Sequence, residues 1–159
     1  MTKSWIANAA IAGVAMCTAP SLLLAQDATP SVWNGGVYAT RSVWSGVYTA
    51  AQADRGKKMY QTACSDCHGD ELEGDPGNGI PPLAGDYFMV DWENYPVSDL
   101  VRHIHFRPND EADDMDIVTA TDLVAYLLAK NQIPVGGTEL PSSRAIQVQI
   151  RIDARKPEQ

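Results

Sequence analysis

The feature that most constrains this chain is the run Cys64-Ser65-Asp66-Cys67-His68, which has the form C-x-x-C-H. This spacing is typical of covalent attachment of a c-type haem. The thiols of Cys64 and Cys67 would bond the two vinyl groups of one porphyrin, and His68 would be the proximal ligand to the iron. A zinc site would need a second ligand pair, and a thioredoxin-like disulfide would need a βαβ pattern nearby. The sequence has neither, so it predicts one covalently bound haem c.

The charge of the chain limits its partners. The 159 residues include 12 Lys and Arg against 20 Asp and Glu, which gives a formal net charge of −8. Nucleic acid is an unfavourable partner for such a chain. A redox protein with a basic docking face is the better expectation. The length fits one domain with appendages.

The amino terminus has the pattern of an export signal. A short basic start is followed by an interrupted apolar run, and Leu22-Leu23-Leu24-Ala25 precedes a polar pair. We therefore predict a signal peptide over residues 1–25, cleaved after Ala25, and a periplasmic protein. The apolar run is too short for a comfortable membrane span, although an uncleaved leader that anchors the chain stays open.

Residues 26–48 contain two similar segments. SVWNGGVY begins at Ser31 and SVWSGVY at Ser42, and both interleave aromatic residues with turn residues. We expect extended chain that packs over a hydrophobic edge. A second interpretation is that Trp33 and Tyr38 form an aromatic docking surface.

A helix is predicted over residues 50–63, directly before the motif. Thr49 and Gln52 have the spacing of a capping box. Gly56 costs about 1 kcal/mol relative to Ala inside a helix, so another helix that crosses closely would explain it. The loop over residues 69–79 is polar and rich in glycine, and its acidic residues do not match the spacing of a calcium-binding EF-hand.

A helix, C-x-x-C-H and then Pro81-Pro82-Leu83-Ala84-Gly85 resembles a class I cytochrome c, in which P-x-L-x-G follows the haem motif. The similarity covers residues 46–140. It is greatest to single-haem bacterial cytochromes associated with periplasmic dehydrogenases, which share the Gly-Val-Tyr lead-in, a Phe-x-x-x-Trp segment and an Ala-Tyr-Leu-Leu helix. The resemblance implies an all-α class I cytochrome c fold over residues 49–140, after an extended amino-terminal segment and before a tail over residues 141–159.

The resemblance also implies the surroundings of the haem. The carbonyl of Pro81 would accept the Nδ1 proton of His68 and fix the imidazole tautomer. Leu83 would contact the haem, and Trp92 and Phe88 would line it.

Three helices are expected after the haem loop. They cover residues 86–95, then 100–106 after a start at Ser98 or Asp99, and a final helix that Thr119 or Thr121 caps and that ends at Lys130. The family likeness places Tyr126 of the final helix near Gly56.

The sixth iron ligand is where the chain departs from the family. Relatives carry Thr-Met-Pro after the penultimate helix, but here the chain reads His105-Phe106-Arg107-Pro108 and is one residue shorter. Met115 is the nearest loop methionine, although relatives place an apolar core residue there. The alternatives are a histidine, with His105 preferred to His103, or no protein ligand. We take Met115 forward, because a shortened loop that rearranges could bring the next methionine inward.

The tail alternates apolar and polar residues. Ile146, Val148, Ile150 and Ile152 alternate with polar residues over residues 145–153. This period of two predicts a strand. Its partner would be residues 31–48 or the edge of another protein, and the alternative is an unstructured extension.

Together these features predict a periplasmic carrier, not an enzyme, that transfers single electrons between redox proteins. One alternative is a haem protein with an open iron site that binds a small ligand or acts catalytically. Another is a fixed haem subunit of a larger dehydrogenase or respiratory complex.

Overall fold

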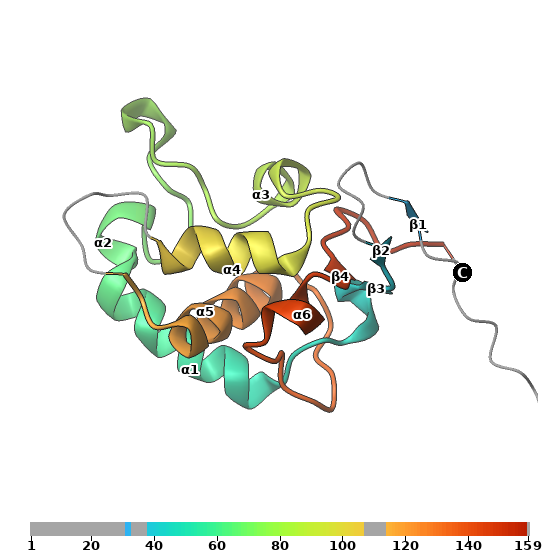
Figure 1. Ribbon diagram of the computed structural model, residues 1–159. Coiled ribbons are helices and arrows are strands. Elements are labelled where there is room, and N and C mark those ends of the chain that lie inside the picture. The colour runs from blue at the N-terminus through green and yellow to red at the C-terminus, as the bar shows by residue number, and fades with distance from the viewer. Residues whose placement is uncertain (1–30, 33–37, 107–113, 159) are drawn as a thin grey trace, which may run out of the picture.

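The computed structural model describes residues 31–32, 38–106 and 114–158, and the fold of this part of the chain is helical (Figure 1). The helices are α1 (Ala50–Ala63), α2 (Ser65–His68), α3 (Asp86–Asp91), α4 (Val97–His105), α5 (Ile117–Lys130) and α6 (Arg144–Gln147). The strands are two residues long: β1 (Ser31–Val32), β2 (Tyr38–Ala39), β3 (Arg41–Ser42) and β4 (Ile150–Arg151). The expected all-α fold is therefore confirmed. The expected leader and Trp33 lie outside the described residues.

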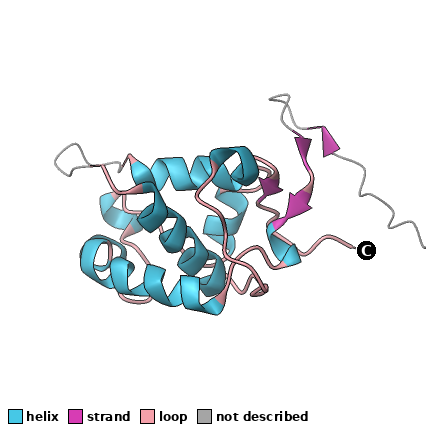
Figure 2. Cartoon of the chain, turned by 60° about the horizontal axis from the view of Figure 1, so that its bottom comes forward, coloured by secondary structure: helices cyan, strands magenta, loops and turns pink. Residues whose placement is uncertain are grey.

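Helices α1 and α5 cross at Gly56, and this crossing forms the centre of the fold (Figures 1 and 2). A Cβ atom on Gly56 would stand 2.0 Å from the carbonyl oxygen of Asp122 and 2.9 Å from Cβ of Tyr126. The rings of Tyr60 and Tyr126 pack beside it, with centroids 5.3 Å apart. The prediction that Gly56 lets a second helix approach closely is confirmed.

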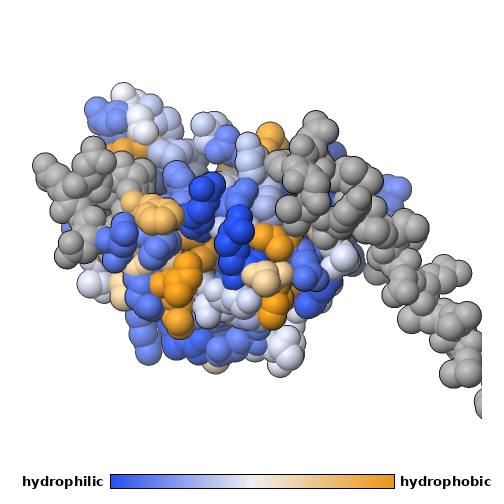
Figure 3. All heavy atoms as spheres, viewed as in Figure 1, coloured by the Kyte–Doolittle hydropathy of each residue, from blue (hydrophilic) through white to orange (hydrophobic). Residues whose placement is uncertain are grey.

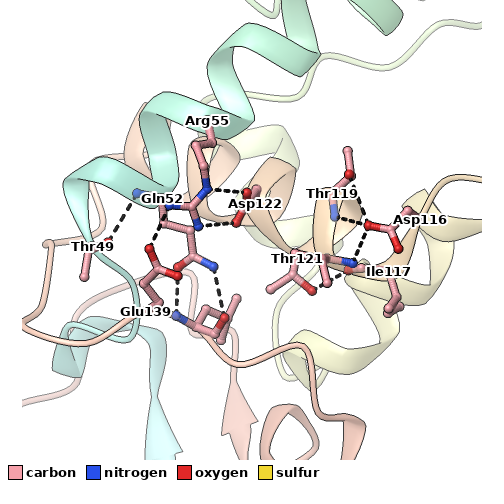
Figure 4. Close-up of polar contacts among 11 residues, drawn as sticks. Thr49, Gln52, Arg55, Asp116, Ile117, Thr119, Thr121, Asp122 and Glu139 are labelled. Atoms are coloured by element: carbon pink, nitrogen blue, oxygen red, sulfur yellow. Dashed lines mark hydrogen bonds and ion pairs between the residues drawn. The ribbon is translucent and has the colours of Figure 1, made fainter.

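The amino-terminal end of α1 is capped as expected, but Gln52 has a different role. The hydroxyl of Thr49 accepts a hydrogen bond of 3.2 Å from the backbone N–H of Gln52. The buried Gln52 side chain then donates to the carbonyl of Leu140 at 3.0 Å and accepts from its N–H at 2.7 Å. Arg55 binds Asp122 of α5 and Glu139 through ion pairs of 2.7 and 2.8 Å (Figure 4). These contacts hold the segment after α5 back along α1.

The start of α5 corrects the expected cap. The helix begins at Ile117, and Asp116, not Thr119 or Thr121, is its N-cap. One carboxylate oxygen of Asp116 accepts from the N–H of Val118 at 3.1 Å and of Thr119 at 3.0 Å (Figure 4). The Thr121 hydroxyl instead donates to the carbonyl of Ile117 at 2.7 Å, within the helix.

The two shorter helices also differ slightly from the expected ranges. Helix α3 ends at Asp91, four residues early, and the chain then turns through Asn94, which has a positive φ of 69°. Helix α4 begins at Val97, directly after Pro96.

The tail is the main correction to the expected secondary structure. Residues 144–147 form α6, and in the described part of the tail only residues 150–151, β4, form a strand. The prediction of a strand over residues 145–153 is therefore wrong. Gln147 is buried, and its side-chain amide donates to the carbonyl of Pro141 at 2.7 Å, whereas Ile146 is 43% exposed. The pairing partner is the chain itself, because β4 lies parallel to β3.

The tail closes one side of the fold. The indole N–H of Trp44 donates to the carbonyl of Asp153 at 2.9 Å. Ile152 is buried and exchanges backbone hydrogen bonds with Asn94, at 2.8 Å, and with Tyr95, at 2.9 Å. The tail therefore lies between the segment before α1 and the turn that joins α3 to α4.

The surface mixes hydrophilic and hydrophobic residues. In Figure 3, hydrophilic residues surround several hydrophobic ones near the centre of the face shown. The described residues include no helix long and apolar enough to span a bilayer.

Candidate haem site

Helix α2 brings the two cysteines and the histidine onto one helical turn. The chain leaves α1 at Cys64, whose N–H still donates to the carbonyl of Tyr60 at 2.9 Å. The carbonyl of Cys64 then accepts from the N–H of Cys67 at 3.2 Å and of His68 at 2.9 Å. Cys64 is half-buried and packs against the core, Cys67 is exposed, and neither forms a disulfide. Two thiols and an imidazole on one turn are what attachment to a single porphyrin requires.

The imidazole of His68 is held by the loop that follows it. Its Nδ1 atom lies 3.0 Å from the carbonyl oxygen of Pro81, the bond that the family likeness implied. A carbonyl can only accept, so Nδ1 carries a proton, and in the neutral imidazole Nε2 then carries the lone pair. This is the tautomer that binds a metal through Nε2. The hydrogen bond to the Pro81 carbonyl raises the basicity of the imidazole.

The loop from Gly69 to Gly85 turns back so that Pro81 reaches His68. The N–H of Gly74 donates to the carbonyl of His68 at 2.8 Å, and the N–H of Leu83 donates to the carbonyl of Leu72, also at 2.8 Å. Gly74 has a positive φ of 63°, and a Cβ atom there would stand 2.6 Å from the carbonyl oxygen of Pro81. Glycine at this position therefore allows the close approach.

Tyr60 ties the same loop to α1. The side chain is buried, and its hydroxyl donates to the carbonyl of Gly69 at 2.6 Å. Burial raises the pKa of Tyr60, so the hydroxyl stays protonated and remains a donor.

Asn131 fixes the second half of the loop, and the sequence analysis missed it. This residue is 8% exposed and directly follows α5. Its side-chain amide donates to the carbonyls of Leu83, at 3.0 Å, and Leu127, at 2.8 Å, and its oxygen accepts from the N–H of Gly85 at 2.8 Å. The signal that could have found it is a polar side chain placed directly after an apolar helix.

Aromatic rings gather at the end of α3. Trp92 is half-buried, and its ring centroid lies 6.5 Å from that of buried Phe88 and 5.7 Å from that of Tyr95. The ring of His103, on α4, stands edge-on to Trp92 at 5.6 Å. That Trp92 and Leu83 contact the haem stays a prediction.

The candidates for the sixth iron ligand lie in two places. Met115 is 5% exposed and belongs to the hydrophobic core. Its N–H donates to the carbonyl of His105 at 2.8 Å, and Nδ1 of His105 hydrogen-bonds the Met115 carbonyl in return. His103 is exposed and lies apart from this pair, beside Trp92. Arg107 lies outside the described residues.

The hydrogen bond between His105 and the Met115 carbonyl determines which ring nitrogen of His105 could bind iron. Because its Nδ1 donates to a carbonyl, the neutral form of His105 has its lone pair on Nε2, as in His68. The ligand prediction for Met115 and its two histidine alternatives all stay predictions.

One comparison with known proteins bears on this site. Residues 51–127 match the family model described as cytochrome c oxidase, cbb3-type, subunit III. The match includes Cys64, Cys67, His68 and Pro81, and it extends from α1 into α5. No curated protein matches the chain.

Proposed function

Because residues 51–127 form a c-type cytochrome domain, we propose that this protein holds one haem c and transfers single electrons between redox proteins in the periplasm. A cytochrome c domain binds its haem covalently, and the haem supplies the change of redox state. The chain supplies attachment through Cys64 and Cys67, ligation through His68 and a buried surrounding. The protein is then a carrier and not an enzyme. The single C-x-x-C-H motif supports one haem.

The observation that carries this proposal is the hydrogen bond between His68 Nδ1 and the carbonyl of Pro81. It holds the ring in one tautomer and one orientation beside the two thiols. A ligand that is already oriented limits rearrangement when the iron changes its charge, which is what an electron carrier needs.

Covalent attachment is tested on the purified holoprotein. The haem should stay with the chain on a denaturing gel and give a c-type pyridine haemochrome spectrum. Cys64→Ser or Cys67→Ser should weaken this attachment. Ser65→Ala, between the two cysteines, is the matched control and should keep it. Haem that acid-acetone extracts freely from the wild type would refute the proposal.

The sixth ligand decides between a carrier and a second candidate function, the binding of a small ligand at an open iron site. What favours the second candidate is that Met115 packs in the core, while His105 and His103 each contact a neighbour. If Met115 is the ligand, Met115→Leu should abolish the thioether-to-iron absorption band, lower the potential and let CO bind. If a histidine is the ligand, His105→Ala or His103→Ala should cause the spectral change instead. A high-spin wild type that all three substitutions leave unchanged would support the open site.

A third possibility is a fixed haem subunit of a dehydrogenase or respiratory complex. The oxidase subunit named in the family description supports it, because that protein works within a larger assembly. Purification of the native protein distinguishes the two arrangements. A stoichiometric partner that stays bound at high salt indicates a subunit, and a monomer indicates a mobile carrier.

The periplasmic location rests on the leader pattern of residues 1–25. Cell fractionation with mass analysis of the mature amino terminus tests it. We expect the chain in the periplasmic fraction, beginning after Ala25, and a cytoplasmic chain that retains Met1 would refute the location.

A further inference from the structure

Helix α3 has one buried face and one exposed apolar face. Phe88 and Met89 are 2% and 6% exposed and pack into the core. Tyr87 and Val90 are 61% and 63% exposed. Residues three apart in a helix are neighbours on its surface, so Tyr87 and Val90 form an apolar pair that the described part of the chain does not cover. Contiguous exposed apolar surface rimmed by polar residues marks interaction sites.

The negative charge of the chain is concentrated in the sequence segment that contains this helix. Between Gly69 and Val101 there are eight Asp and Glu and no Lys, Arg or His. The remaining 12 acidic residues equal the 12 Lys and Arg elsewhere, so this segment carries the whole formal net charge of −8. In Figure 1 the segment runs along the top of the molecule, from the loop after α2 through α3. Such a one-sided charge steers an oppositely charged partner toward that side.

Three of these carboxylates flank the apolar pair. Asp86, Asp91 and Glu93 are exposed. None of them takes part in the ion pairs found within the described residues. The outer face of α3 therefore has an apolar centre and an acidic rim, as in interfaces whose core is apolar and whose rim is polar.

We propose that the outer face of α3, centred on Tyr87 and Val90 and rimmed by Asp86, Asp91 and Glu93, is the docking surface for a redox protein with a Lys- and Arg-rich face. This inference rests on the proposed function and names the kind of partner and where it binds. Docking there would place the partner on the helix whose C-cap is Trp92, the ring expected to line the haem.

Charge-neutral variants of the holoprotein test the location. The probe is a small lysine-rich cytochrome c with a net positive charge, and its binding is measured by calorimetric titration at low and high ionic strength. The triple variant Asp86→Asn, Asp91→Asn, Glu93→Gln should weaken binding at low ionic strength by about tenfold or more. The matched control Asp54→Asn, Asp114→Asn, Glu158→Gln removes the same charge from exposed positions outside the segment. It should weaken binding by less than about threefold, because distant exposed charges are screened.

The apolar centre is tested separately. Tyr87→Ser combined with Val90→Ser should weaken binding at both ionic strengths by a similar factor, because salt does not screen apolar contacts. Equal losses in the two charge variants, or no loss in the serine variant, would overturn the proposed surface. Self-association of the wild type that the α3 variants abolish would show that the occupant is a second copy of this chain, which would overturn the basic partner.

Failure of the docking surface and failure of the proposed function give different results. Electron exchange with the same probe is followed by stopped-flow alongside binding. A wild type that binds through α3 but exchanges no electrons contradicts the electron-carrier function. A wild type that exchanges electrons while the α3 triple variant binds normally contradicts the docking surface alone.

Discussion

Replacing Gly56 with alanine tests the helix crossing on which the candidate haem site depends. The new Cβ would stand 2.0 Å from the carbonyl oxygen of Asp122 and 2.6 Å from its carbonyl carbon. Carbon and carbonyl oxygen approach to about 3.3 Å at closest in ordinary contacts, so α1 and α5 would have to separate by roughly 1 Å. Both opposing atoms belong to the backbone, and rotation of a side chain cannot relieve the clash.

The expected loss of stability combines two opposite effects. Alanine is favoured over glycine inside a helix by about 1 kcal/mol. Forcing extra volume into a packed core costs about 1–3 kcal/mol, and more where the backbone must shift. Because this clash is with the backbone of a buried helix, we expect the upper end of that range, and so a net loss of about 2 kcal/mol in the free energy of unfolding.

Urea unfolding of the oxidised holoprotein, followed by far-UV circular dichroism, measures this loss. The slope of the unfolding free energy with urea should stay constant if the native and unfolded states keep their compactness. Gly77→Ala is the control, because its nearest neighbour would be the Asp75 side chain at 3.4 Å and its φ is not in the left-handed region. It should change stability by less than about 0.5 kcal/mol. If Gly56→Ala is as stable as the wild type, or is more stable because alanine is the better helix former, the reasoning about the crossing is wrong.

Three further outcomes are expected. Gln52→Ala should lower the free energy of unfolding by about 1–3 kcal/mol for each of the two buried backbone groups that it leaves without a partner, while Gln61→Ala, exposed on the same helix, should have little effect in the same urea assay. Asn131→Ala should lower stability by about 2 kcal/mol and also shift the haem potential measured by voltammetry, since the loop carbonyl and N–H that Asn131 binds lose their partner; an unchanged potential would mean that the loop holds its place without it. The pKa of Asp116 is lowered from 3.8, mainly by the hydrogen bond from the N–H of Thr119, so its capping stabilises the fold above about pH 3.8 and is lost as the pH falls through the lowered pKa. Asp116→Asn should flatten this part of the acid-unfolding curve, and a curve that keeps its shape would contradict the capping role.

The sequence predicted those parts of the fold that depend on local or pairwise signals. Thr49 predicts the start of α1, because a hydroxyl before a helix satisfies an otherwise unpaired N–H. Gly56 predicts that another helix crosses α1, because a glycine inside a helix is unfavourable without a packing reason. The bond from His68 to Pro81 followed from the family likeness and not from any local rule. These three features are present in the structure.

The start of α5 was mispredicted because several residues compete as caps. Asp116, Thr119 and Thr121 can all accept a hydrogen bond from a backbone N–H. The carboxylate of Asp116 takes two of them, and Thr119 adds a third bond of 3.2 Å from its own hydroxyl. Only the path of the chain, with Met115 already buried in the core, decides which of the three lies at the helix end.

The tail was mispredicted because one polar residue points inward. An alternating pattern predicts a strand only if the polar residues face solvent. Gln147 is 1% exposed, and its amide donates to the hydroxyl of Thr121 at 3.2 Å and to the carbonyl of Pro141. A buried amide with two partners is acceptable in a core. Sequence alone does not reveal those partners, since Thr121 lies 26 residues away.

The supports of the candidate site come partly from outside the region that matches the family. The match ends at residue 127. Asn131, which fixes the loop that carries Pro81, follows it, as does Leu140, which binds Gln52 of α1. Ile152 braces the turn beside Trp92 through two backbone hydrogen bonds. The motif residues can therefore be read from the sequence, but their positions depend on three later segments that carry no haem motif of their own. For this reason the cysteine pair and the histidine are enough to predict a covalently bound haem, whereas a prediction of its potential and sixth ligand needs the packing of the rest of the chain.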